Sequence, residues 1–249
     1  MQQTSDLYKN ILSDKNHQKE VRVFVNDTPY YQTDIFSLKT VSGLFSDSAP
    51  TVGSCVAREI DLELKGTVEL PRMAVIRPEV RLISQTLGES EWLKKGTFFI
   101  DTREKKKYTT LIHGYDSMLK TEMPYLLEGV QPSFPRKELI VVQDILNDIN
   151  IGSTTETIIT LDADTYNLLS STKFDVEYTN QMTEREVLSG IATLHVGNWT
   201  ITDDNKLKLV PFIKKSIWIS LLITEHGNPI VFGKGENGVR IIVWFLCWW

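Results

Sequence analysis

Residues 56–66 read VAREIDLELKG, and this stretch decides the class of fold. Apolar and charged residues alternate along it from Glu59 to Lys65. Successive side chains of a β-strand point to opposite faces, so the alternation predicts a strand with one buried and one solvated face. Such a strand is typical of an antiparallel sheet, because parallel sheets are buried on both faces. The residues expected on the buried face are Ile60, Leu62 and Leu64.

The segments on either side of this strand follow the same period of two. Proline cannot donate a hydrogen bond to a sheet ladder, so Pro78 is expected to separate two strands. The charged run REKKK (103–107) lies between two β-type segments and is expected to connect them as a hairpin. The strands expected in this half of the chain are residues 21–25, 60–64, 73–76, 79–83, 96–102 and 108–113.

Beyond Pro135 the hydrophobic period changes to that of helices. Apolar residues at helical spacing predict a helix over 139–149, ended by Asn150 and Gly152. Thr183 and Glu186 form a capping box that opens a further helix, running to Thr193. Together these patterns predict an α+β fold that is mainly β. The remaining expected elements are a helix over 6–17 capped by Thr4 or Ser5, a helical turn over 114–120, a strand over 157–161, a helix over 165–170 capped by Asp164, and a hairpin of 199–202 with 206–210.

Composition excludes several classes of protein. The 249 residues are 41% hydrophobic and carry a net charge of −5, which excludes wholesale disorder and disfavours DNA binding as the main role. Two cysteines cannot form a disulfide framework or a four-thiolate zinc site. The N-terminus has no apolar signal region, and the apolar run 239–249 is about half of the roughly 20 residues that a membrane helix needs. We therefore expect cytoplasmic synthesis and no membrane partner.

Three motifs have simple structural interpretations. The stretch Gly233–Gly238 matches G-x-G-x-x-G, but strand-forming VRIIV follows it where a dinucleotide site needs a helix. We interpret it as a loop between strands. The pair Asp162 and Asp164 resembles a metal-binding acidic pair, and it is more simply the start of a helix. Finally, Glu59, Asp61 and Glu63 share the solvent face of one strand, so they are not expected to form an acid–base cluster.

The histidines do not indicate an active site either. His113 lies near Asp101, Asp116 and Ser117 in the sequence, but no G-x-S-x-G nucleophile motif accompanies them. The other histidines are scattered without metal-ligand spacing. We expect no catalytic, cofactor-binding or metal-binding residues and no cofactor, and therefore a structural or binding protein rather than an enzyme.

Several ordered segments carry a resemblance to a known family. Together they resemble the N-terminal part of phage and prophage tail hub proteins, the baseplate hub and tail-associated family. MTEREVLSGIA (182–192), followed by the hairpin at Trp199, is similar to the small domain inserted after that part. The likeness spans residues 20–215. The matching segments in the first half are VGSCVAREIDLEL (52–64), PRMAVIRPEVRL (71–82), EWLKKGTFFIDTRE (91–104) and TTLIHGYDSMLKTEMPY (109–125).

The resemblance implies a fold and a place in an assembly. It implies small antiparallel β-barrels, with three copies forming a ring between the tail tube and the tip proteins in the virion tail. The implied partners are a second and third copy, a distal tail or tube protein and a tail tip or spike, with DNA only passing through a channel. Gly96 and Gly114 would be turn or bulge positions. The residues implied to fill the barrel or pack against a neighbour are Phe98, Phe99, Ile100 and Leu111.

On this basis the chain is expected to have three parts. Residues 1–125 would be a β-barrel-like hub domain, 126–215 a small mixed α/β insertion domain, and 216–249 return strands or the start of a truncated second barrel. The run VRIIVWFLCWW (239–249) is expected to be a strand with a self-associating end and Cys247 as a free thiol. Deleting Trp244–Trp249 should then improve solubility.

Two other functions remain open. The chain could be the anchoring half of a tail-associated cell-wall hydrolase, although it contains no peptidase or glycosidase motif. It could also be a carbohydrate-binding adhesion module, which would present its aromatic residues on one exposed face. Trp92, Trp199 and Trp218 lie in three separate segments, which disfavours that module.

Overall fold

The described part of the chain belongs to two compact units, Met1–Val210 and Pro211–Trp249. The described residues of the second unit include an antiparallel pair of strands, β15 (Ser220–Ile223) and β16 (Pro229–Phe232). The predictions for Trp218, for the glycine-rich loop and for the C-terminal run lie outside the described residues. The residues that the computed structural model describes are 2–45, 50–126, 133–172, 174–177, 182–212, 220–223 and 229–232.

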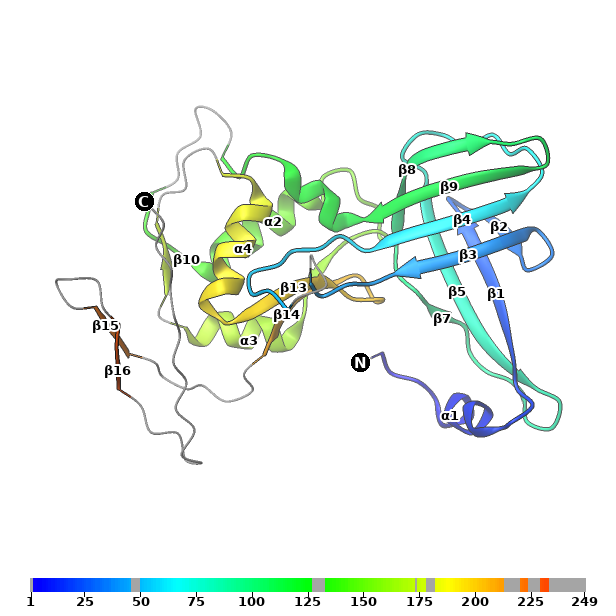
Figure 1. The fold of residues 1–249 in the computed structure, drawn as a ribbon, viewed down its shortest axis with the longest axis horizontal. Helices are drawn as coiled ribbons and strands as arrows, with labels where there is room; N and C mark the ends of the chain where they lie inside the picture. Colours follow the sequence, from blue (N-terminus) through cyan, green and yellow to red (C-terminus); the bar gives the residue numbers. More distant parts are fainter. Residues whose placement is uncertain are drawn as a thin grey trace. The chain divides into compact units, whose positions relative to one another are not determined.

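Nine strands of the first unit form one antiparallel sheet (Figure 1). They are β1 (Gln18–Val25), β2 (Thr28–Tyr31), β3 (Ile35–Val41), β4 (Glu59–Lys65), β5 (Val75–Ser84), β6 (Gly88–Glu89), β7 (Leu93–Lys94), β8 (Phe98–Lys105) and β9 (Thr109–Asp116). Their order is β2-β1-β5-β8-β9-β4-β3, and the short β6 and β7 pair with β5. The strands β1 and β5 cross steeply over the β3-β4-β9 side, so the sheet curls around its own core.

The curled sheet does not close into the expected barrel. Its two end strands, β2 and β3, follow each other in the chain, yet no ladder joins them among the described residues. β2 has four residues, and one of them is Pro29, which cannot donate to a ladder. The result is an open sheet with a seam between β2 and β3.

The alternation along β4 is confirmed. Ile60, Leu62 and Leu64 are each at most 1% exposed, whereas Asp61 and Lys65 on the other face are exposed. The inward side chains of β4 meet those of the strands opposite and form what we call the sheet core. Its buried members are Val23, Val25, Ile60, Leu62, Leu64, Leu70, Ala74, Ile76, Phe98, Ile100 and Ile112.

The two strands predicted around Pro78 are a single ten-residue strand, β5. The Pro78 carbonyl accepts a hydrogen bond from the Lys95 N–H at 2.9 Å, just beyond the end of β7. On this side β5 pairs with β8 at Val75 and Ile76 and with β7 at Glu79 and Val80. Pro78 therefore lies in the gap between two partners, where its missing N–H interrupts no ladder.

The predicted β8–β9 hairpin is present and contains a bulge. The register shifts between Ile100 and Thr102, so Asp101 is the extra residue. A Cβ atom at Gly114, beside this bulge, would lie 2.5 Å from the Phe99 carbonyl oxygen. Gly96, which precedes β8, has a φ of +105°. Both glycine positions disfavour a side chain, in line with the turn or bulge role that the resemblance implied.

The four apolar residues implied to fill the barrel or pack against a neighbour divide between the two faces. Phe98 and Ile100 lie in the sheet core, whereas Phe99 and Leu111 are half-buried on the other face.

Helices and short strands make up the rest of the first unit (Figure 1). The helices are α1 (Asp6–Ser13), the 3-10 helix η1 (Ser117–Glu122), α2 (Glu138–Ile149), α3 (Ala163–Ser171) and α4 (Glu184–Leu194). The strands are β10 (Arg136–Lys137), β11 (Thr160–Leu161), β12 (Asp175–Val176), β13 (Gly197–Ile201) and β14 (Lys206–Pro211). β10 pairs with β12, and β14 lies between β11 and β13. The fold class is α+β, mainly β, as predicted.

These elements surround a second core, here called the helical core. α4 has the predicted capping box: the Glu186 N–H donates to Thr183 Oγ1 at 3.2 Å, and Glu186 Oε2 accepts from the Thr183 N–H at 2.8 Å. Trp199 of β13 is 0% exposed and donates from Nε1 to the Leu188 carbonyl at 2.7 Å. The other members with 0% exposure are Met118, Val141, Val142, Ile145, Leu188, Ala192 and Leu207.

Four local predictions need correction. Asp162, not Asp164, caps α3, because its carboxylate accepts from the Asp164 and Thr165 N–H groups. Helix α1, with Ser5 as its N-cap, ends at Ser13 rather than His17. Of the strand predicted over 157–161, Thr160 and Leu161 alone are paired. The helical turn predicted at 114–120 begins at Ser117, since residues 114–116 complete β9.

Candidate functional site

The candidate catalytic residues have separate structural positions. His113 Nδ1 lies 2.7 Å from Asp61 Oδ1, on the solvated face of the sheet. Asp116 lies on the opposite face of β9 and is 2% exposed. Its Oδ1 accepts from the Met118 N–H at 3.0 Å and caps η1. Burial raises the pKa of Asp116 to about 7, although the nearby positive charge of Arg58 acts to lower it. The structure thus brings His113 to Asp61, and not to Asp116.

The potential metal ligands and nucleophiles are also engaged elsewhere. Asp162 caps α3 and lies 3.5 Å from Lys208 Nζ. In the part of the chain that the structure describes, no three His, Cys, Asp or Glu side chains are grouped to hold a metal ion. Burial raises the pKa of the Cys55 thiol to about 12, so this thiol stays protonated at neutral pH. No helix among the described residues is long and apolar enough to cross a membrane.

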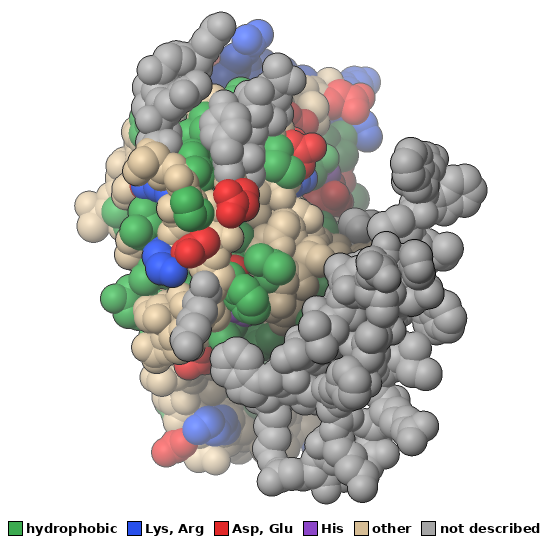
Figure 2. Space-filling view, turned by 90° about the vertical axis from the view of Figure 1, so that its left-hand side faces the viewer, with side chains coloured by type: hydrophobic (Ala, Val, Ile, Leu, Met, Phe, Trp, Pro, Cys, Tyr) green, Lys and Arg blue, Asp and Glu red, His purple; other side chains and the backbone are tan. Residues whose placement is uncertain are grey.

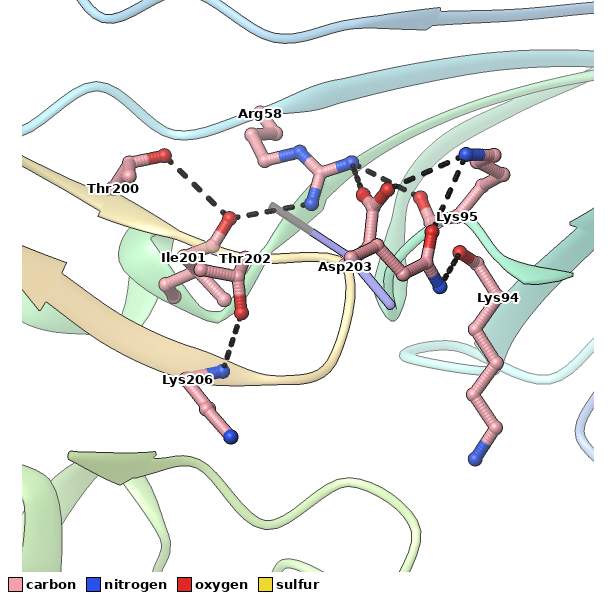
Figure 3. A network of polar contacts seen from close by, with 9 residues as sticks. Arg58, Lys94, Lys95, Thr200, Ile201, Thr202, Asp203 and Lys206 are labelled. Atoms are coloured by element: carbon pink, nitrogen blue, oxygen red, sulfur yellow. Dashed lines mark hydrogen bonds and ion pairs between the residues drawn. The ribbon is translucent and has the colours of Figure 1, made fainter. Parts of the chain in front are cut away.

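The most elaborate polar arrangement joins the sheet to the helical part of the first unit (Figure 3). It centres on Arg58, which directly precedes β4 and is 5% exposed. Its Nη1 donates to the Ile201 carbonyl at 3.2 Å, and its Nη2 donates to the Lys95 carbonyl at 3.0 Å and to Asp203 Oδ1 at 2.7 Å. One side chain therefore connects the start of β4, the segment before β8 and the β13–β14 turn.

The surroundings of Arg58 fit its guanidinium closely. The group lies over the Phe98 ring, 5.5 Å from its centroid. A Cβ atom at Gly96 would lie 3.1 Å from Nη1, so a side chain there would displace the guanidinium. Lys95 Nζ adds a second cation 3.6 Å from Asp203 Oδ2, as Figure 3 shows. Together these contacts fix the orientation of the β13–β14 turn against the sheet.

A second connection runs through the segment before β4. The Gly53 N–H donates to the Gly197 carbonyl, and the Trp199 N–H donates to the Ser54 carbonyl, each at 2.9 Å. The Asn198 side chain is 0% exposed; its Oδ1 accepts from the Ser54 N–H at 2.8 Å, and its Nδ2 donates to the Leu44 and Thr51 carbonyls. The chain between β3 and β4 thus runs alongside β13 and ties the two cores together.

A groove opens beside this connection. It has a volume of about 560 Å³. Its charged groups include Glu59, Glu186 and Arg185, and Arg185 is already engaged with Glu122 Oε1 at 2.9 Å and with the Met118 carbonyl at 3.0 Å. The Glu186 carboxylate also accepts from Thr183 in the capping box, so Glu59 is the charged group of the groove whose side chain has no such partner among the contacts of the described residues. The other lining residues are Gly53, Cys55, Val56, Ala57, Tyr115, Leu119 and Ser189.

Sequence reasoning did not identify these joint and groove residues. Arg58 and Asp203 are 145 positions apart, and no local pattern links them. One feature of the sequence does point to Arg58. It stands two positions before Ile60 in AREIDLEL, so its side chain is expected on the same, buried face of the strand. A buried arginine requires a carboxylate or carbonyl partner, and the sequence does not tell which one.

Comparison with known proteins relates this architecture to a solved fold. No protein-family model and no curated protein matches the sequence. The 43 kDa tail protein of prophage MuSo2 from Shewanella oneidensis matches 83% of this chain with a TM-score of 0.50 and 15% identity. A tail protein from Neisseria meningitidis MC58 matches 77% of it with a TM-score of 0.44 and 12% identity. The chain covers 59% and 51% of these two proteins, and at 15% identity the first likeness shows a similar fold.

Proposed function

We propose that this chain is a structural subunit of a phage or prophage tail. The observation that carries the proposal is the likeness of its fold, over 83% of its length, to the prophage MuSo2 tail protein. The sequence segments that resemble tail hub proteins fall within the same fold, on β4, β5, β8 and β9. A shared fold and an independent resemblance in sequence thus favour the same role.

Within the tail, we assign the chain to the baseplate hub, which connects the tail tube to the tail tip. Its partners would be further copies of itself, most simply in a trimer, a distal tail or tube protein, and a tip or spike protein. DNA would only pass through the channel of the ring. The proposed division is 1–125 for the hub domain, 126–215 for the insertion domain and 216–249 for return strands. The joint at Arg58 suits a connector, because it holds the sheet and the helical part in one orientation.

We further propose that the chain acts without catalysis of its own. Its candidate residues have structural partners: His113 pairs with Asp61, and Asp116 caps η1. Purified protein is expected to release no fragments from peptidoglycan. Cleavage that disappears in His113→Ala would contradict this and would favour the hydrolase-anchoring function.

The tail assignment is tested by locating the protein in particles. Antibodies raised against the purified chain, coupled to gold, are applied to tails released from a bacterial culture that carries the gene. We expect label at the tail end that is distal to the head. Label absent from tails, or spread evenly along the tube, would contradict the hub assignment. Antibodies to an unrelated cytoplasmic protein of the same culture provide the control.

A further inference from the structure

The turn of the β8–β9 hairpin, residues 106–108, is exposed and basic. Lys106, Lys107 and Tyr108 connect the end of β8 to the start of β9, and Tyr108 is 71% exposed. Within the described part of the chain neither lysine forms an ion pair, and Lys107 Nζ lies 5.0 Å from the centroid of the Tyr108 ring. Lys105, by contrast, pairs with Glu69. The turn therefore presents to solvent an aromatic ring with one lysine stacked on it and a second lysine that has no ion-pair partner among the described residues.

Protection of a sheet edge does not explain these residues. Charged side chains protect unpaired strand edges from pairing with other chains. This accounts for Arg103 and Lys105, which lie in the half of β8 that β5 does not pair with. Lys106, Lys107 and Tyr108 lie outside both strands, where there is no ladder edge to protect. Exposed aromatic residues are enriched at contact surfaces, and a basic patch beside one favours a partner of opposite charge by electrostatic complementarity.

The residues that follow the nine-stranded sheet in the chain carry an excess of acidic side chains, two of which, Glu138 and Glu184, are buried. Residues 126–212 contain 13 Asp and Glu against six Lys and Arg, whereas residues 1–125 contain 17 of each. Figure 2 shows acidic side chains lying among hydrophobic ones on the side of the first unit that carries the helices. The 560 Å³ groove lies where the two parts meet: Glu186 comes from α4, Glu59, Val56 and Leu119 come from the first 125 residues, and Arg185 is the cation of the lining.

The hairpin turn cannot reach the groove of its own chain. β4 and β9 form one ladder in which Glu59 pairs with Tyr115 at the groove end and Lys65 pairs with Thr109 at the turn end. Six residues of strand separate the two ends, a distance of about 20 Å at 3.4 Å per residue. In Figure 1 the β8–β9 turn correspondingly lies at the end of the sheet that points away from the helices. The two complementary surfaces can meet only between copies.

We propose that the turn 106–108 of one copy docks in the groove of a second copy of this chain. Tyr108 would pack against Val56 and Leu119, while the two lysines would face Glu59 and Glu186. Because the two surfaces differ and lie at opposite ends of one ladder, the contact is head-to-tail and forms a ring if the rotation closes. This inference adds a specific contact between copies to the proposed tail function. It rests on that function only for the number of copies in the ring.

Charge reversal in the turn is the first test. Lys106→Glu with Lys107→Glu should weaken self-association roughly a hundredfold, measured by light scattering over a range of concentrations, because like charges would then meet in the groove. Lys15→Glu with Lys19→Glu is the matched control: it makes the same change in net charge at exposed lysines far from the turn in sequence, and we expect no change. A thermal melt of each variant confirms that it is folded.

A mixing experiment tests the head-to-tail geometry. Glu59→Lys blocks the groove but leaves the turn intact. The triple variant Lys106→Ser, Lys107→Ser and Tyr108→Ser has the converse defect and adds no negative charge that the altered groove would attract. At a concentration where the wild type associates and each variant alone is monomeric, their mixture should form a one-to-one pair that grows no further. A wild-type oligomer that neither variant affects would overturn this inference and leave the tail assignment standing. A wild-type protein that is monomeric at all concentrations would also overturn the inference. So would a monomer that binds a DNA probe through Lys106 and Lys107. In each case the tail assignment is decided separately, by the labelling of particles.

Discussion

Arg58 is the residue on which the connection between the two cores depends most. Charged side chains are rarely buried unless they are paired, because removing a charge from water is costly. Arg58 compensates for this cost with two carbonyls, the carboxylate of Asp203 and the face of Phe98. Its planar guanidinium holds five N–H donors in a fixed geometry, whereas the compact lysine ammonium has three.

Replacement of this side chain is therefore expected to be severe. Arg58→Met is similar in size but removes the donor to Asp203 Oδ1 and to two carbonyls, and it leaves Lys95 as the cation beside Asp203. We expect the free energy of unfolding to fall by about 3 kcal/mol, the magnitude typical of a broken buried ion pair. Denaturant titration measures the change. Arg72→Met, at an exposed arginine, is the control and should change it by less than about 0.5 kcal/mol. Equal effects of the two substitutions would contradict the role of Arg58.

Asp116 makes a pH-dependent contribution to stability. Its pKa is about 7 in the folded protein and 3.8 in the unfolded chain, so the folded state binds a proton more tightly. The contribution of Asp116 to the free energy of unfolding is fully present below pH 4 and is lost as the pH rises to about 7. The positive charges of Arg58 and Arg185 lower its pKa, but burial has the larger effect. Asp116→Asn retains an acceptor for the Met118 N–H and cannot ionise. The difference in unfolding free energy between variant and wild type should favour the variant increasingly from pH 4 to pH 7, by about 1.4 kcal/mol per pKa unit at most.

The measurement is a series of denaturant titrations at fixed pH for both proteins. Taking the difference between them removes the contribution of other titrating groups, such as Glu184, whose pKa burial raises to about 8. A difference that does not vary with pH would show that Asp116 is ionised in the folded protein throughout.

At the scale of single elements, the capping box of α4 offers a local test. Thr183 satisfies the Glu186 N–H, and the Glu186 carboxylate satisfies the Thr183 N–H. Thr183→Ala should lower the free energy of unfolding by about 1 kcal/mol, because the end of the helix loses an acceptor. Thr193→Ala, in the last turn of the same helix, is the control; it removes a hydrogen bond to the Ser189 carbonyl but no cap. The expectation fails if the two substitutions cost the same.

Elements were predictable from the sequence where local patterns determine them. The alternation in β4 and the capping box of α4 depend on neighbouring residues, and both are confirmed. The prediction that Pro78 separates two strands was wrong, because the effect of a proline on a sheet depends on which strands pair beside it, and that pairing is a tertiary property. The same holds for the joint: the partners of Arg58 and Asn198 lie more than 100 positions away along the chain, except for the Lys95 carbonyl. Local periodicity carries no information about such pairings.

At the scale of the whole molecule, the joint and the charge distribution bear on assembly. The segment before β4, Arg58 and the β13–β14 turn hold sheet and helices together, so a neighbouring copy would meet one body. The basic β8–β9 turn and the groove lined by Glu59 lie at opposite ends of the β4–β9 ladder, so that body has two unlike ends. A body with complementary unlike ends favours heterologous contacts, and heterologous contacts close into a ring or continue as a filament.

The final prediction is the oligomeric state. The resemblance to tail hub proteins implies a trimer that joins a six-fold tube to a three-fold tip, with two similar barrels in each chain. The described residues of this chain include one curled sheet of nine strands. We expect either a closed trimer, at three times 28.5 kDa, or a monomer that becomes trimeric when a second C-terminal barrel is joined to it. Light scattering on both forms measures the mass. A closed ring keeps this mass as concentration rises, whereas a filament grows. A stable monomer or dimer in the longer form would contradict the hub assignment, because neither can match the three-fold tip.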